Sequence, residues 1–203
     1  MPPKFIFIRH AEAEHNVAFH VVGESAFKNE QFRDAPLTKK GIEQAQLAAK
    51  QLESYKIMDL WCSPLQRCRQ TALELFEELT INHMYLHDCL LERQGDGYVC
   101  NIRKAKKELQ EDEDAVIFDV GFLAEKPAEW SQRESSSCLV QRMKMLILQL
   151  ADMYSSYDES YHILIVGHGD ALGFLLERSF KNAEFVIMSV DEIPRCLTVG
   201  TVS

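Results

Sequence analysis

The sequence lacks several features that would assign it to a common class of protein. No stretch approaches the roughly 18 consecutive apolar residues that a membrane-spanning helix needs. The six cysteines include no CxxC pair, which argues against a zinc ribbon or a thioredoxin-type site. The net charge of −9 argues against nucleic acid or an anionic membrane as the main partner. What remains is a globular protein with 46% apolar residues, enough for a sizeable core.

Several catalytic and targeting motifs are also missing. The sequence has no Walker A loop, no glycine-rich dinucleotide motif and no recognisable cluster of metal ligands. We therefore expect neither a metal nor another cofactor. The apolar stretch near the N-terminus ends at Arg9 and is too short for a signal peptide. We expect a cytoplasmic protein whose cysteines are reduced and buried as small hydrophobic residues.

Apolar patterns predict strands that alternate with helices along the chain. The predicted strands cover residues 4–8, 57–62, 83–87, 162–166, 185–190 and 196–199. The predicted helices begin at Thr38 and at Ser63-Pro64, and a third covers 138–154. The acidic segment 108–115 reads as a solvated helix end or loop. This alternation is typical of an α/β fold with a mostly parallel sheet, and no linker divides residues 1–203 into more than one domain.

Two histidines occupy matching positions just after two of these strands. His10 follows the strand at 4–8, and His168 follows the strand at 162–166. A lone histidine at such a place is more often structural. However, ligands of open α/β sheets bind beyond the carboxyl ends of the strands, so residues from opposite ends of the chain can face one pocket. The matched placement therefore favours a functional site.

Two arginines accompany the histidines. Arg9 directly precedes His10, and Arg67 lies near the start of the helix predicted from Ser63. Guanidinium groups match phosphate oxygens and stay charged at any working pH. The N-terminus of a helix also favours an anion. Arg67 alone is equally consistent with a solvated helix residue, but the combination predicts a cradle for an oxyanion.

Four motifs, in order, resemble those of the histidine phosphatase superfamily, the phosphoglycerate-mutase-like proteins. The family's nucleophile motif is similar to FIRHAEAEHN, its next helix start to PLTKKGIEQA, its second arginine motif to CSPLQRCRQTA and its second histidine motif to IVGHGDALGF. Ala11 stands where the family commonly has glycine. With the pair His15-Asn16, this alanine resembles a eukaryotic mutase-like branch. The resemblance implies a three-layer α/β/α sandwich with a mostly parallel central sheet.

The resemblance also implies roles for the matching residues. His10 would be the catalytic nucleophile, and His168 would assist it. The phosphoryl oxygens would be bound by Arg9, Asn16, Arg67 and His168. Glu92, in LLERQGDG, would be the general acid, with Asp88 and Asp96 as alternatives. No metal takes part in this set of residues.

The expected function is hydrolysis of a small phosphorylated substrate through a phosphohistidine on His10. One alternative is a cofactor-dependent phosphoglycerate-type mutase, which must exclude water from the phosphohistidine. The other is a non-catalytic binding module. The segment 17–36 is expected to form a loop over the pocket, and possible further contacts are Phe19, Phe27, Phe32, Arg33, Arg93 and Arg103. The expected partner is a small-molecule phosphate ester, with no nucleic acid or membrane, and the sequence assigns no oligomeric state.

Overall fold

The centre of the protein is a six-stranded sheet. We describe it from a computed structural model that covers residues 2–194, so the strand predicted at 196–199 lies outside the described residues. The strand order is β4-β3-β2-β5-β1-β6, and each neighbouring pair is parallel except β1 and β6. The strands are β1 (Lys4–Arg9), β2 (Lys56–Cys62), β3 (His83–His87), β4 (Asp119–Phe122), β5 (Tyr161–Gly167) and β6 (Phe185–Met188). The predicted α/β fold with a mostly parallel sheet is confirmed.

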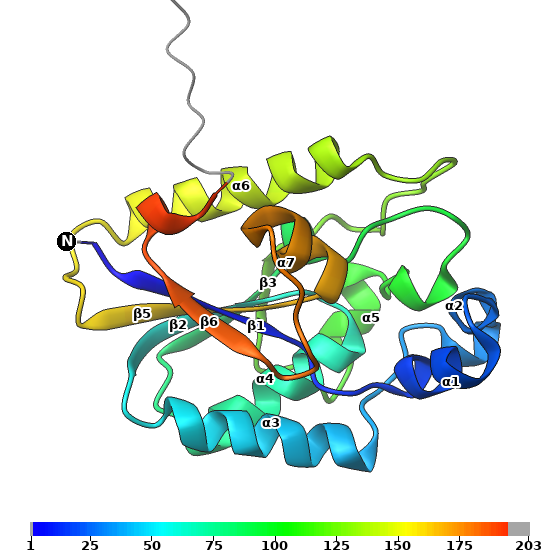
Figure 1. The fold of residues 1–203 in the computed structure, drawn as a ribbon, viewed down its shortest axis with the longest axis horizontal. Coiled ribbons are helices and arrows are strands. Elements are labelled where there is room, and N and C mark those ends of the chain that lie inside the picture. Colours follow the sequence, from blue (N-terminus) through cyan, green and yellow to red (C-terminus); the bar gives the residue numbers. More distant parts are fainter. Residues whose placement is uncertain (1, 195–203) are drawn as a thin grey trace, which may run out of the picture.

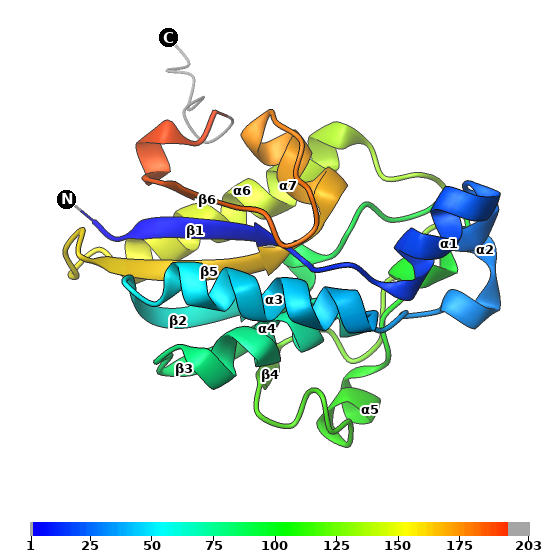
Figure 2. The same cartoon turned by 60° about the horizontal axis from the view of Figure 1, so that its bottom comes forward.

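Helices cover both faces of the sheet, as Figures 1 and 2 show. The helices α3 (Lys39–Leu52) and α4 (Gln66–Glu78) lie on one face, and α6 (Ser136–Met153) and α7 (Gly169–Leu176) lie on the other. Side chains of β1 alternate between these layers, as a strand requires. Phe5 and Phe7 join the core beneath α6 and α7, whereas Ile6 and Ile8 join the core beneath α3 and α4. No helix of residues 2–194 is long and apolar enough to cross a membrane.

The predicted helix starts are partly correct. Thr38 caps α3, since its Oγ1 accepts a hydrogen bond from the Gly41 amide at 3.0 Å. The helix predicted from Ser63 begins at Gln66 instead, with Leu65 at the cap position. The hydroxyl of Ser63 is 2.7 Å from Nε2 of His168, so this serine contacts a neighbouring strand end rather than capping the helix.

Three strands end side by side and thereby gather residues from distant motifs. The register pairs Arg9 with Gly167 and Cys62 with Val166. The next residues in each strand, His10, Ser63 and His168, therefore leave the sheet at the same edge. Beyond this edge lie α1 (Glu14–Val22), α2 (Ser25–Lys28) and a 3-10 turn at Glu30–Phe32. The expectation of a simple loop over 17–36 is wrong, because most of this segment is helical.

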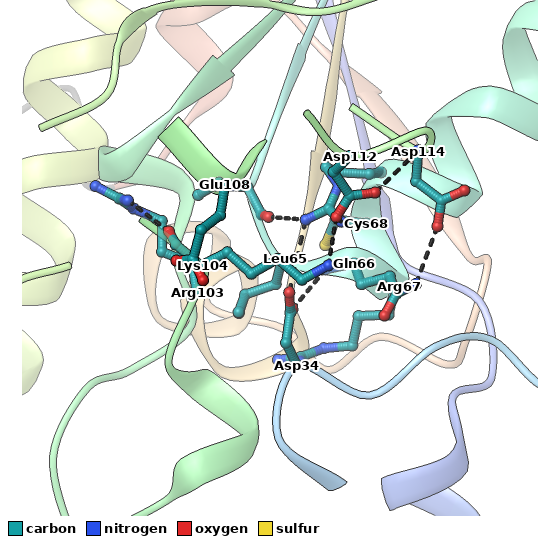
Figure 3. Close-up of polar contacts among 12 residues, drawn as sticks. Asp34, Leu65, Gln66, Arg67, Cys68, Arg103, Lys104, Glu108, Asp112 and Asp114 are labelled. Atoms are coloured by element: carbon teal, nitrogen blue, oxygen red, sulfur yellow. Dashed lines mark hydrogen bonds and ion pairs between the residues drawn. The ribbon is translucent and has the colours of Figure 1, made fainter. Parts of the chain in front are cut away.

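The acidic segment 108–115 is anchored to the protein rather than simply solvated. It begins in the last turn of the short helix α5 (Lys106–Gln110) and continues past it, and Asp112 Oδ2 lies 3.0 Å from Nη2 of the fully buried Arg69. Asp114 accepts hydrogen bonds from the side chains of Gln66 and Gln70, at 3.0 and 2.9 Å. Figure 3 shows these carboxylates gathered around the start of α4. The segment therefore fixes the helix that carries Arg67.

Candidate active site

A cavity of about 310 Å³ lies at the edge where β1 and β5 end. Its walls come from the first histidine motif, from α4, from the segment 92–101 and from the start of α7. Five of the predicted site residues line it: Arg9, His10, Asn16, Arg67 and Glu92. Other lining residues that the sequence analysis did not single out for a role include His15, Gln94, Tyr98, Asn101, Arg133 and Asp170.

The imidazole of His10 has a defined orientation. Its Nδ1 lies 2.7 Å from the carbonyl oxygen of Ala11, and a carbonyl can only accept, so Nδ1 carries the proton. Nε2 is then the unprotonated nitrogen. Burial lowers the pKa of His10 well below its ordinary value, and the positive charges of Arg67 and Arg9 lower it further. The ring is therefore neutral at neutral pH.

Two guanidinium groups lie in this cavity without a carboxylate partner. Nη1 of Arg9 donates to the Phe180 carbonyl at 2.7 Å, and Nη1 of Arg67 donates to the Cys100 carbonyl at 2.8 Å. Among residues 2–194, neither arginine forms an ion pair, and Nε of each is buried without a hydrogen-bond acceptor. Buried positive charge without an ion pair is costly, so the cavity is suited to an anion.

Asn16 and His15 form the wall next to His10. Oδ1 of Asn16 accepts from the Ala13 amide at 3.0 Å, and its amide nitrogen lies 3.1 Å from Nε2 of His15. The His15 ring lies 6.0 Å from the His10 ring, measured between centroids. Burial, with the charges of Arg67 and Arg9, lowers the pKa of His15 to about 2. His15 therefore adds no charge to the cavity.

His168 lies behind this wall and does not line the cavity itself. Its ring is fully buried and lies 5.2 Å from the His10 ring, measured between centroids. Nδ1 lies 3.2 Å from Nη2 of Arg67, which can only donate, so the proton is on Nε2 and is shared with Ser63 Oγ at 2.7 Å. Burial, then Arg67 and His10, lower the pKa of His168 well below its ordinary value. In this arrangement His168 is neutral and both of its nitrogens are occupied.

Glu92 reaches the cavity from the segment after β3. Its Oε1 accepts from the amides of Arg93 and Ala171, at 2.8 and 3.0 Å. Its Oε2 accepts from the Asp170 amide at 3.2 Å. Burial raises the pKa of Glu92, and the nearby charge of Asp170 raises it further. Glu92 thus retains a proton to higher pH than an exposed glutamate.

The two alternative acids are placed less well. Asp88 lies outside the cavity, where both of its oxygens accept from Arg103, at 2.7 and 2.9 Å. Asp96 lines the cavity but is exposed, and its Oδ2 lies 3.0 Å from Nε of Arg133. Asp170 is a third carboxylate on the cavity wall, and its place two residues after His168 was the signal that could have revealed it.

Of the other suggested contacts, some line the cavity and others lie outside it. Phe27 and Arg93 line the cavity, and Phe19 stacks on Phe27 with ring centroids 5.0 Å apart. Arg103 cannot reach a substrate anion in this cavity because Asp88 and backbone carbonyls hold it elsewhere. Phe32 and Arg33 do not line this cavity. Residues 2–194 contain no group of three or more side chains placed to ligate a metal ion.

Comparison with solved structures identifies related folds. A mycobacterial glucosyl-3-phosphoglycerate phosphatase complexed with VO3 matches with a TM-score of 0.59 and 19% identity, over 92% of this chain and 91% of the other. A phosphoserine phosphatase from Entamoeba histolytica, complexed with 3-phosphoglyceric acid, has a TM-score of 0.56 and 20% identity, over 93% and 91%. A putative alpha-ribazole-5′-P phosphatase from Escherichia coli has a TM-score of 0.59 and 18% identity, over 92% and 90%. At these identities the likeness shows the fold.

The sequence itself carries the family assignment. No curated protein sequence matches the chain significantly. The family model of the histidine phosphatase superfamily (branch 1) matches residues 5–186, which include both histidine motifs, both arginines and Glu92. The resemblance inferred from four short motifs thus extends over most of the chain, and the protein belongs to the histidine phosphatase superfamily.

Proposed function

We propose that this protein is a phosphomonoesterase in which Nε2 of His10 attacks the phosphoryl group of a small ester. The observation that carries the proposal is the hydrogen bond from His10 Nδ1 to the Ala11 carbonyl, at 2.7 Å, within a cavity that holds two unpaired arginines. A nucleophilic nitrogen needs a free lone pair, and this bond leaves Nε2 with one. The arginines supply the charge that the transferred phosphoryl group requires.

Departure of the alcohol requires an acid, and Glu92 is suited to that role. Oε1 already accepts two hydrogen bonds, whereas Oε2 accepts one. The remaining lone pair of Oε2 is therefore where a proton can be carried to the leaving oxygen. After departure the ionised carboxylate can activate water, which then attacks the phosphohistidine and returns His10 to its starting state.

Arg9, Arg67, Asn16 and His168 are the proposed ligands of the phosphoryl oxygens. His168 needs one change before it can donate to them. Its Nε2 proton must turn from Ser63 to a phosphoryl oxygen, or Nδ1 must be protonated. The approaching dianion favours both changes, since a nearby negative charge raises the pKa of an imidazole.

Hydrolysis is favoured over the two alternatives. The phosphatases with similar folds are described as acting on, or are bound to, small phosphorylated compounds, which supports a small phosphate ester here. A non-catalytic module has no need for an unprotonated histidine beside two unpaired arginines and a carboxyl group of raised pKa. We treat residues 1–203 as one catalytic domain that needs no cofactor. The mutase alternative differs only in the acceptor of the phosphoryl group, and it is tested below.

The nucleophile is tested by trapping the intermediate. Enzyme mixed with a ³²P-labelled ester and quenched in alkali should retain the label, and an acid quench should release it, because phosphohistidine is acid-labile. His10→Ala should carry no label under either quench. His87→Ala is the matched control, because His87 lies outside the cavity, and it should label like the wild type. Label that persists in His10→Ala would place the nucleophile elsewhere.

A further inference from the structure

We propose that the substrate is a phosphate ester whose alcohol carries a hydroxylated ring, and that the ring binds in a second cavity beside the first. This inference rests on the proposed phosphatase function and adds the class of leaving alcohol to it. The second cavity has a volume of about 750 Å³, against about 310 Å³ for the first. Small-molecule sites commonly measure about 300–1,000 Å³, so the second cavity is large enough for a ring.

The two cavities adjoin. Gln94 and Tyr98 line both of them. The same two segments, 94–98 and 129–133, supply further walls to each cavity. The first cavity takes Asp96 and Arg133 from them, and the second takes Gly95, Gly97, Glu129 and Trp130. These segments are in direct contact, because a Cβ added to Gly95 would lie 2.4 Å from the Gln132 carbonyl oxygen. A ligand anchored by its phosphate in the first cavity can therefore extend past Gln94 into the second.

Gln94 offers a hydrogen-bond acceptor at the junction. Its Nε2 donates to the carbonyls of Glu92 and Asn101, at 2.8 and 3.1 Å, which fixes the orientation of the amide. The other amide atom, Oε1, accepts no hydrogen bond from residues 2–194. A fixed and unused acceptor is suited to a hydroxyl group of the ligand, since it is already oriented before binding.

Trp130 offers an aromatic face in the second cavity. This residue is 42% exposed, and its indole N–H donates to no residue among 2–194. Such a side chain presents an apolar face and a polar edge to a ligand. A ring with an apolar face and hydroxyl groups at its edge complements both.

Most cations of the second cavity are already neutralised within the protein. Arg103 pairs with Asp88 at 2.7 Å, Lys104 with Asp112 at 2.5 Å, and Arg33 with Glu30 at 2.7 Å. Figure 3 shows Lys104 and Asp112 near the start of α4. The second cavity is therefore better suited to a neutral hydroxylated ring than to a second phosphoryl group. A sugar and a nucleoside both carry a hydroxylated ring, and the test below distinguishes between them.

The inference is tested with three esters: glycerol 3-phosphate, glucose 6-phosphate and adenosine 5′-monophosphate. At least one ring-bearing ester should have a higher kcat/KM than glycerol 3-phosphate. Trp130→Ala should lower kcat/KM for that ester about tenfold more than for glycerol 3-phosphate, mainly through KM, as expected for the loss of an aromatic contact. Phe76→Ala is the matched control, because Phe76 is 40% exposed on α4 and lines neither cavity. Equal effects of Trp130→Ala on all three esters would overturn the inference.

A binding measurement separates this inference from the proposed function. The chain has two tryptophans, and the buried Trp61 lines neither cavity, so a ligand-induced change in tryptophan fluorescence reports on Trp130 in the second cavity. Titration of His10→Ala with the preferred ring ester should change this fluorescence, whereas glycerol 3-phosphate should not. The change should disappear in the double variant that also carries Trp130→Phe. A fluorescence response without phosphate release by the wild type would refute the phosphatase and support the ring site, and no response at saturating ester would refute the ring site.

Discussion

Burial shifts the titration of the two central residues in opposite directions. It lowers the pKa of His10, helped by Arg67 and Arg9, and it raises the pKa of Glu92, helped by Asp170. Catalysis as proposed needs His10 neutral and Glu92 protonated. Activity therefore falls as the pH decreases through the pKa of His10, and it falls as the pH increases through the pKa of Glu92. We expect a bell-shaped profile of kcat/KM, with its optimum between the pKa of His10 and the pKa of Glu92.

Glu92→Gln tests which limb belongs to which residue. The amide keeps the size of the side chain but has no carboxylic proton, so the alkaline limb should disappear. Hydrolysis of an alkyl phosphate should slow by roughly 10²–10⁴-fold, the usual range for loss of an acid catalyst. An aryl phosphate, whose leaving group needs little protonation, should slow much less. Steady-state pH profiles of Glu92→Gln and the wild type, recorded with both esters, measure the alkaline limb and the extent of slowing.

The neighbouring carboxylates provide the controls for that substitution. Asp96→Asn and Asp170→Asn should retain the alkaline limb, since these residues line the same cavity without the proposed role. If either of them, rather than Glu92→Gln, reproduces the selective loss with the alkyl ester, the acid has been assigned to the wrong residue.

Ser63 accepts the Nε2 proton of His168 in the described arrangement. Ser63→Ala removes the acceptor of the Nε2 proton in a fully buried setting. Cys68 Sγ lies 3.4 Å from the same nitrogen and remains as a weak acceptor. The free energy of unfolding should therefore fall by about 1 kcal/mol, the lower end of the cost of a buried donor that loses its partner. Urea unfolding measures the change, and exposed Ser155→Ala should leave the value within experimental error. An unchanged stability of Ser63→Ala would mean that this hydrogen bond contributes nothing.

Residues next to strand ends were predictable from the sequence, and residues placed by tertiary contacts were not. Arg9, His10 and Arg67 follow strong apolar runs, so their meeting at one edge of the sheet could be anticipated. Gln94 acquires its place only through hydrogen bonds to the backbone of Glu92 and Asn101. No pattern in the sequence around Gln94 carries that information.

At the scale of elements, the same distinction separates predicted from missed structure. The buried strands β1, β2 and β5 were predicted because a strand that is covered on both faces of the sheet is apolar along nearly its whole length. β4 was missed because it has only four residues, includes a glycine and is mostly exposed at the edge of the sheet. α1 and α2 were missed because their contact, the stacked rings of Phe19 and Phe27, joins two segments of weak individual pattern.

The start of α4 depends on the acidic segment after α5. Arg69 is fully buried and is held by Asp112 at 3.0 Å and by Asp34 at 3.6 Å. Asp112→Ala should destabilise the protein by about 3 kcal/mol, the lower end for breaking a buried pair, because Asp34 still compensates part of the charge. Urea unfolding measures this loss, and Asp152→Ala, an exposed change on α6, is the control. A loss below about 1 kcal/mol would show that Asp34 alone suffices.

The same ion pair predicts how stability depends on pH. Burial raises the pKa of Asp112, but Lys104 and Arg69 outweigh it, and the net pKa lies below its ordinary value. The stabilisation is therefore complete above the pKa of the unfolded chain and is lost as the pH falls through the folded pKa. In Asp112→Ala this acid-side dependence should be weaker than in the wild type.

At the scale of the whole molecule, the choice between hydrolysis and transfer depends on access of water to the phosphohistidine. The segment that holds α1 and α2 places Phe27 on the cavity wall, and Phe27 meets Tyr98 with ring centroids 5.3 Å apart. A mutase needs a cover that excludes water throughout the transfer. We expect these two short helices, one of only four residues, to leave water access and to favour hydrolysis.

Product partitioning decides between the two outcomes. With 3-phosphoglycerate and a bisphosphoglycerate primer, free phosphate should form faster than 2-phosphoglycerate. A chelator should leave both rates unchanged, because the proposed charge stabilisation comes from arginine side chains. Rapid conversion to 2-phosphoglycerate, with little phosphate released from any ester, would assign the protein as a mutase. A requirement for added magnesium or zinc would contradict the proposed mechanism.

The strand that carries the proposed nucleophile is synthesised before the strands with which it pairs. In the part of the chain that the structure describes, β1 forms hydrogen bonds only with β5 and β6, both of which lie beyond residue 160. A ribosome that has completed only the first 160 residues has already made His10, Arg67 and Glu92. It has not yet made a strand against which β1 can align. A prematurely terminated chain would therefore carry most of the proposed catalytic groups without the strands that bring them together, and we expect it to be inactive.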